Sequence, residues 1–135
     1  MYESKVMKSF KPLGICEKFA CRDTAGATKL VDLLDNNSGR FTINNVCNVV
    51  KTAVHNDRVK DDNKEYSNIF IMTADGDVYY SSSETLWSDL EGMIDVFSDE
   101  EQEVALFDIS IIAVPSRNNQ QAFLKARLID VKYAL

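Results

Sequence analysis

The chain has 135 residues, of which 45% are hydrophobic and 27% are charged, and its formal net charge is −6. These values are typical of one ordinary globular domain that is long enough to bury a core, and they exclude collagen-like and low-complexity chains. No apolar run approaches the ~18 residues of a membrane span, and the first residues lack the apolar middle of a signal peptide. We therefore expect a cytoplasmic protein that forms a single domain over residues 1–135.

The N-terminal part of the chain shows a mixed pattern followed by a helix. Residues 1–22 intersperse lysines with apolar residues and fit either an arm or an extra strand that adds to the sheet. Asp23-Thr24 is typical of a helix start, and the apolar residues of 25–35 recur at helical spacing. We expect the helix to end at the Asn- and Gly-rich residues 36–39, which tolerate a left-handed cap.

A long strand is predicted over residues 40–54, which are rich in β-branched side chains. The pair Asn44-Asn45 interrupts the alternation of this strand and predicts a bulge or a bend. The highly charged residues 55–66 follow as a loop that is longer than most hairpin loops.

A β-hairpin comes next along the chain. Residues 68–73 and 78–80 both have the composition of strands, and Asp75-Gly76 lies between them. Asp-Gly at this place favours a tight turn, because the turn requires positive φ.

The second half of the chain predicts a helix and two strands. Residues 84–98 carry an apolar stripe at helical spacing, and Ser83 is a good N-cap for this helix. The strands follow at 104–114 and 122–133, and the polar loop 116–121 joins them.

The order of these elements predicts the fold. Without the N-terminal helix, it is strand, long loop, strand, tight turn, strand, helix, strand, loop and strand, which is the order of the OB-fold. We therefore expect a mainly β protein with two helices. It would be a five-stranded OB-fold-like barrel with a helix between strands 3 and 4 and an extra N-terminal helix. An α+β two-layer sheet built from the same elements is the competing arrangement.

Three stretches of this sequence resemble the small single-stranded-DNA-binding proteins of tailed bacteriophages. In chain order they are ATKLVDLLDNNSGRFTINNV, IFIMTADGDVYYSSSETLWSDLEGMIDVF and SRNNQQAFLKARLID. Their order and spacing carry the resemblance, and Asn119 departs from it because the family often has Gly at this place. The resemblance implies an OB-like fold that covers single-stranded DNA during phage DNA replication or recombination, without catalysis, in the host cytoplasm.

The last strand carries the chemistry that such binding requires. Sequence-independent binding of a single strand uses cations along the phosphates and aromatic faces against the bases. Phe123, Lys125 and Arg127 alternate with aliphatic residues and therefore share one face of the strand. The predicted contacts from the other strands and from the two loops that line an OB-fold site are Lys51, Arg58, Lys60, Phe70, Tyr80 and Arg117.

Several of these residues also fit a purely structural role. Phe70 is compatible with the core, and Tyr79 and Tyr80 must face opposite sides of their strand, so that only one of them can face a ligand. The basic residues of 55–66 stand among acidic ones and also fit an ordinary solvated loop.

The acidic residues are concentrated in one segment of the chain. Residues 84–108 contain nine acidic residues and no basic one, whereas the rest carries fifteen Lys and Arg against twelve Asp and Glu. This distribution is compatible with an anionic ligand bound on another face. The acidic face of the helix fits three interpretations: a solvated surface, a contact for a basic replication or recombination protein, or a surface that keeps a single strand off the wrong face of the barrel. The alternative function is therefore an OB-like protein-interaction module that modulates a host or viral protein through Asp89, Glu91 and Asp95.

Catalytic and metal-binding functions have little support in the sequence. The three cysteines include no CxxC pair, and the chain has one histidine. This set is too small for a typical zinc site or for a Ser-His-acid triad, and no phosphate-binding glycine motif follows a strand. We expect free thiols, no metal or other cofactor, and no enzymatic activity.

Overall fold

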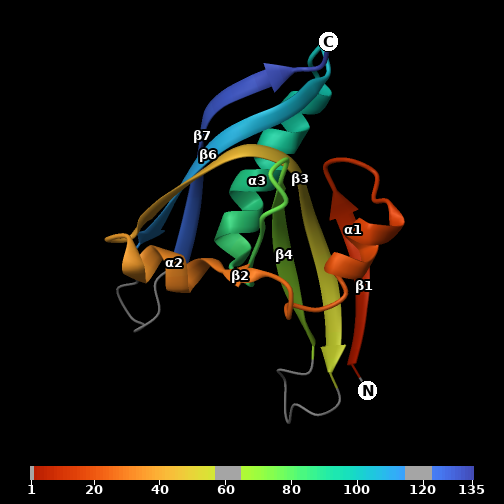
Figure 1. The fold of residues 1–135 in the computed structure, drawn as a ribbon, viewed down its shortest axis with the longest axis vertical. Helices are drawn as coiled ribbons and strands as arrows, with labels where there is room; N and C mark the ends of the chain where they lie inside the picture. The colour runs from red at the N-terminus through yellow and green to blue at the C-terminus, as the bar shows by residue number, and fades with distance from the viewer. Residues whose placement is uncertain (1, 57–64, 115–122) are drawn as a thin grey trace.

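The computed structural model describes residues 2–56, 65–114 and 123–135, which form seven strands and three helices (Figure 1). In chain order the elements are β1 (Tyr2–Ser9), α1 (Ile15–Ala20), β2 (Thr28–Lys29), α2 (Leu30–Asn36), β3 (Arg40–Asn56), β4 (Glu65–Thr73), β5 (Val78–Ser81), α3 (Glu84–Ser98), β6 (Val104–Val114) and β7 (Phe123–Tyr133). The predicted long strand, hairpin, acidic helix and two C-terminal strands are confirmed by β3 to β7 and α3.

All seven strands belong to one mixed sheet with β3 at its centre. The order along the sheet is β2-β5-β4-β3-β6-β7, and β1 also pairs with β3. The first half of β3 pairs with β6, and the second half pairs with β4 on one edge and with β1 on the other. One strand therefore organises two halves of the sheet.

A bend separates these two halves of β3. The pairing with β6 shifts register between Ile43 and Val46, and Asn45 has a left-handed backbone with φ of 58°. The Asp108 carboxylate accepts a hydrogen bond of 2.8 Å from the backbone N–H of Asn45. The bend predicted at Asn44-Asn45 is confirmed. Asn suits this place because it tolerates the left-handed region better than most residues do.

The sheet does not close into the predicted five-stranded barrel. The succession β5-β4-β3-β6-β7 is present, but within the described residues β5 and β7 are not paired. Side chains of α3 bind the free edge of β7 instead. Thr85 Oγ1 donates to the Leu124 carbonyl at 2.9 Å, and Asp89 Oδ2 accepts the Ala126 N–H at 3.0 Å. These bonds satisfy backbone groups that a neighbouring strand would otherwise have paired, and the result is an open sheet.

The main core lies between α3 and the sheet face that α3 covers. The apolar stripe of α3 is buried, and Trp87 belongs to it. Phe10, which follows β1, packs its ring 5.6 Å from those of Phe97 and Phe107 and so ties the N-terminal segment to the core. Ser83 caps α3 by accepting the Leu86 N–H, as its position before the helix predicts.

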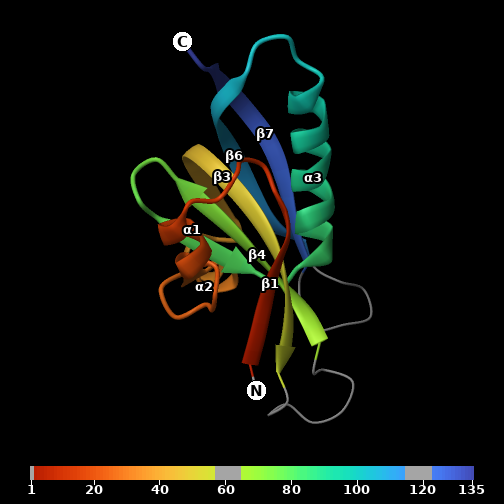
Figure 2. The ribbon, with the colours of Figure 1, turned by 90° about the vertical axis from the view of Figure 1, so that its right-hand side faces the viewer.

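A second, smaller core lies on the opposite face of the sheet. Val50, Phe70 and Met72 are buried there together with Cys21, and Leu13, Ala20 and Ala27 are among the residues packed against them. The alternation along β4 explains this division, because Ile69 and Ile71 face the main core. Figures 1 and 2 show α1 on the side of the sheet away from α3.

The N-terminal helix differs from its prediction. The helix is α2, which begins at Leu30, and it is shorter than the expected 25–35. Thr28 and Lys29 pair with β5 as the short parallel strand β2. Asp23 accepts the Ala25 N–H in a turn instead of capping a helix. The sequence pattern of residues 25–29 fitted a helix. Thr28 and Lys29 form a strand instead, because they pair with the free edge of β5.

None of the helices in the described ranges is long and apolar enough to cross a membrane.

We predict that the contact between Asp89 and β7 stabilises the fold. Asp89→Ala leaves the Ala126 N–H without its acceptor, and we expect a loss of about 1–3 kcal/mol in the free energy of unfolding, measured by urea denaturation. Asp95→Ala is the matched control, because Asp95 lies on the same helix and its ion pair with Lys8 is exposed. Equal losses in the two variants would contradict the prediction.

The three thiols should differ in reactivity. Burial raises the pKa of Cys21 to about 12 and also raises the pKa of Cys47, whereas Cys16 is exposed. Since the thiolate is the reactive form, iodoacetamide at about pH 8 should alkylate Cys16 first and Cys21 only after denaturation, as followed by mass spectrometry. Alkylation of native Cys21 at the rate of Cys16 would show that α1 does not cover the sheet.

Candidate nucleic-acid interface

The face of β3, β6 and β7 that points away from the main core carries a groove. The strand register aligns Arg40, Ile112 and Lys125 in one row across the three strands. The next row contains Thr42, Ser110 and Arg127, and Phe123 lies opposite Val114. A space of about 550 Å³ is lined by Arg40, Ile112, Val114, Phe123, Lys125 and Arg127, among others. The structure thus brings Phe123, Lys125 and Arg127 together on one face.

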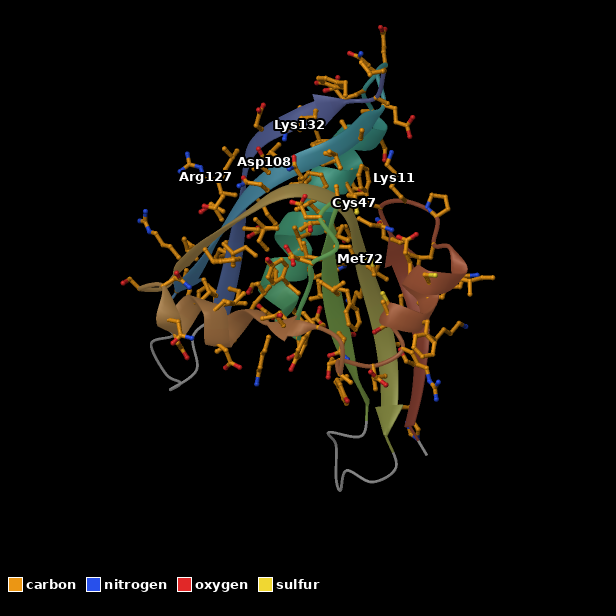
Figure 3. All side chains as sticks on the ribbon, viewed as in Figure 1. Lys11, Cys47, Met72, Asp108, Arg127 and Lys132 are labelled. Atoms are coloured by element: carbon orange, nitrogen blue, oxygen red, sulfur yellow. The ribbon has the colours of Figure 1, made fainter. Side chains whose placement is uncertain are left out.

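The groove combines apolar and cationic surface. Ile112 and Phe123 are 36% and 37% exposed, although both are large and hydrophobic. Arg40 and Arg127 are exposed, and none of the described residues that line the space is acidic. Figure 3 shows Arg127 extending away from the sheet. Such a surface offers a flat ring for stacking and guanidinium groups for phosphate oxygens.

Lys125 has an internal partner as well as a place in the groove. Its Nζ lies 3.1 Å from Asp89 Oδ1, and 45% of its side chain remains exposed. Asp89 is more buried than Lys125 and also accepts the Ala126 N–H, so it is a fixed anchor. The side chain of Lys125 therefore bridges the groove and α3.

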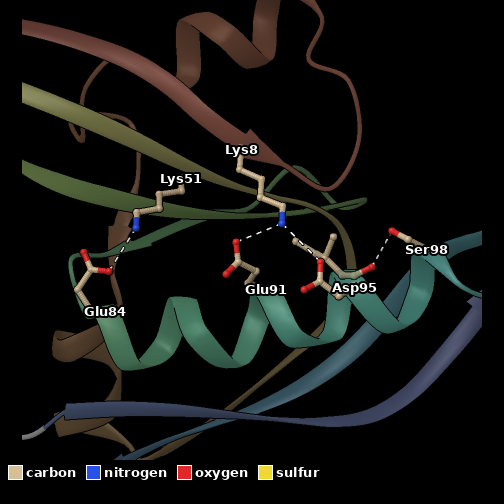
Figure 4. A network of polar contacts seen from close by, with 7 residues as sticks. Lys8, Lys51, Glu84, Glu91, Asp95 and Ser98 are labelled. Carbon is tan, nitrogen blue, oxygen red and sulfur yellow. Dashed lines mark hydrogen bonds and ion pairs between the residues drawn. The ribbon is translucent and has the colours of Figure 1, made fainter.

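Lys51 lies outside the groove, on the face of β3 that α3 covers. Its Nζ pairs with Glu84 at 3.3 Å and lies 5.8 Å from the centre of the Trp87 ring (Figure 4). The alternation along β3 explains the separation, because Lys51 shares the face of Val49, which belongs to the main core, whereas Arg40 faces the groove.

Phe70 and Tyr80 lie in the smaller core, not in the groove. Phe70 has no exposed surface, which corrects the expectation of a ring available for stacking, and the physical reason is the cover by residues 13–27. Tyr80 is half-buried against the same cluster, whereas Tyr79 faces the main core and contacts Phe41. The two tyrosines therefore face opposite sides of the sheet.

Arg58, Lys60 and Arg117 lie outside the described residues.

The acidic residues of α3 make ion pairs within the protein. Lys8 of β1 pairs with Glu91 at 3.1 Å and with Asp95 at 3.5 Å (Figure 4), and its pKa is raised chiefly by the hydrogen bond to Glu91. Glu84 and Asp89 pair with Lys51 and Lys125. These four carboxylates, which include the predicted partner contacts Asp89, Glu91 and Asp95, thus hold other elements of the fold.

The structure adds two residues that the sequence analysis did not select. Arg40 and Ile112 lie side by side in the groove, next to Lys125. The sequence contained a signal for both residues. Ile112 follows Ile111 on a strand, so one of these two side chains must face away from the core. Arg40 likewise alternates with the core-facing Phe41 and Ile43.

No group of three or more His, Cys, Asp or Glu side chains able to hold a metal ion occurs in the part of the chain that the structure describes. The groove offers cations and apolar surface, which suit an anionic ligand with flat apolar parts.

Comparisons with known proteins agree with this chemistry. The family described as Phage Single-stranded DNA-binding protein matches residues 25–127, which cover α2, the groove strands β3 and β6, and the described groove residues of β7. No curated protein and no solved structure gave a significant match. Because the family match spans well over half of the chain, the protein belongs to the phage single-stranded DNA-binding protein family.

Proposed function

We propose that the groove on β3, β6 and β7 binds single-stranded DNA and that the protein covers such DNA during phage replication or recombination. It acts without catalysis, in the cytoplasm of the host. The observation that carries the proposal is the exposed ring of Phe123 beside three cationic side chains, within a chain of this family.

The chemistry of the groove suits one strand whose bases are unstacked. In a duplex the base faces are covered by neighbouring bases, so the Phe123 ring has a stacking partner only on a single strand. Lys125 and Arg127 are one β repeat apart, about 6.6–6.8 Å, and Arg40 lies two strands away, about 10 Å. Cations thus lie on both sides of Ile112, which gives the backbone phosphates more than one contact while a base rests on apolar surface.

The charge distribution supports the same arrangement. The carboxylates of α3 lie on the side of the sheet opposite the groove and already pair with lysines. A net charge of −6 is therefore compatible with an anionic ligand, because Arg40 and Arg127 are exposed in the groove and Lys125, which pairs with Asp89, adds a third cation there.

The direct test is fluorescence anisotropy of a labelled oligo-dT, with a duplex of the same length as the competitor. We expect tight binding of the single strand, weakened by salt, and little binding of the duplex. Absence of binding at low salt would refute the proposal.

The cations of the groove should set the salt dependence. In Arg127→Ala, one phosphate contact is lost, and we expect the slope of log K against log salt to become shallower by about 0.7. Lys132→Ala is the matched control, because Lys132 lies on the same strand but outside the groove and close to Asp108. If both variants kept the slope of the parent protein, Arg127 would have no contact with phosphate.

The ring of Phe123 should contribute through stacking. Phe123→Ala should weaken binding of oligo-dT by about 1–3 kcal/mol, whereas Phe123→Tyr keeps an aromatic face and should bind nearly as the parent does. Thermal unfolding of both variants controls for stability. Equal weakening by the two substitutions would argue against stacking.

A further inference from the structure

We propose that α1 is a second contact for the same DNA strand, formed by Phe19 with Arg22 and Lys18. The inference rests on the proposed function and extends it, because a strand that leaves the groove would reach this platform. We call Lys18, Phe19 and Arg22 the α1 platform.

The α1 platform exposes an aromatic ring beside cations. Phe19 is 72% exposed, and the Arg22 guanidinium lies over its ring, 6.0 Å from the centre. Lys18 and Arg22 are themselves exposed. The chemistry is that of the groove, where Phe123 stands beside Lys125 and Arg127, and it suits a base stacked on the ring with its phosphate near the guanidinium.

The platform stands on a fixed support although α1 has only six residues. Asn48 of β3 is buried, and its side chain both accepts from the Lys11 N–H at 2.9 Å and donates to the Lys11 carbonyl at 3.1 Å. The same amide donates to Glu17 Oε2 of α1 at 3.3 Å, and Cys21 packs into the sheet at the end of the helix. Phe19 is therefore held in place before a ligand arrives, which lowers the entropic cost of binding.

The platform and the groove lie on the same face of the sheet. On β3, Arg40 and Thr42 face the groove, while Val50 faces away from the main core beneath α1. Figures 1 and 2 show α1 on the side of the sheet opposite α3. A single strand can thus extend from one site to the other without passing around an edge of the sheet.

Charge favours DNA over an apolar protein partner for this surface. Residues 11–22 contain three basic residues and one acidic residue, Glu17, in a chain whose net charge is −6. Ile15, one turn before Phe19, is 87% exposed and would matter equally to an apolar partner. Because Ile15 cannot stack on a base, the two residues discriminate between the occupants. Both precede residues 25–127, so the family match does not include this surface.

The experiment compares Phe19→Ala with Ile15→Ala on oligo-dT of two lengths, by anisotropy. An oligonucleotide of about 6 nucleotides fits within one groove. One of about 20 nucleotides is longer than the stretch that a single strand-binding domain usually covers. We expect Phe19→Ala to lose at least about fivefold in affinity for the long strand and to bind the short one as the parent does. Ile15→Ala should bind both as the parent does.

Three results would overturn the proposal. In the first, Phe19→Ala keeps the affinity of the parent for both lengths. In the second, Phe19→Ala loses affinity equally for both lengths. This result counts whether Cys21 stays protected from iodoacetamide or becomes exposed because α1 is displaced. In the third, Ile15→Ala and Phe19→Ala weaken binding alike, which would indicate a general apolar surface. Failure of the proposed function is distinguishable, because the parent protein would then bind neither length.

Discussion

The bend of β3 at Asn45 is the constraint on which the rest of the structure depends. The left-handed backbone of Asn45 and its hydrogen bond to Asp108 let one strand of 17 residues serve two differently oriented halves of the sheet. Before the bend, β3 pairs with β6, which pairs in turn with β7, and these three strands form the groove. After it, the strand supports the β4–β5 hairpin and receives the N-terminal segment. Arg40 and Lys51 therefore lie in different halves of the sheet, one in the groove and the other beside α3.

The lysines and arginines of the chain have divided tasks. Lys8, Lys11 and Lys51 pair with carboxylates in or after α3 and so attach the N-terminal strand and the central strand to that helix. The arginines of the groove point to the opposite side of the sheet. Arginine suits that position, because its planar group binds phosphate with two hydrogen bonds and stacks on flat rings. The lysines that attach these elements to α3 are thus distinct from the arginines of the groove.

Periodicity predicted the elements that are buried on one side, and it failed where distant parts of the chain decide the outcome. The stripe of α3 and the alternation of β6 gave both elements with their observed bounds. By contrast, α1 has only six residues, fewer than two turns, which is too short for periodicity to define a helix. The open edge of β7 depends on Thr85 and Asp89, and the burial of Phe70 depends on residues 13–27. These residues are distant in sequence from the parts that they contact. The groove could be predicted only in part. The alternation along β7 predicted that Phe123 and Arg127 share a face, but only the pairing register of the three strands places Arg40 beside them.

Lys125 lies between Asp89 and the groove, so a ligand phosphate that binds Lys125 there would take the place of the Asp89 carboxylate. A phosphate that displaced the Asp89 carboxylate, which lies 3.1 Å from Lys125 Nζ, would release fewer solution counterions than a phosphate bound at a free cation. Each such exchange also removes one of the two contacts through which Asp89 holds β7 to α3. The Asp89–Ala126 and Thr85–Leu124 hydrogen bonds would still attach α3 to β7 after such a displacement.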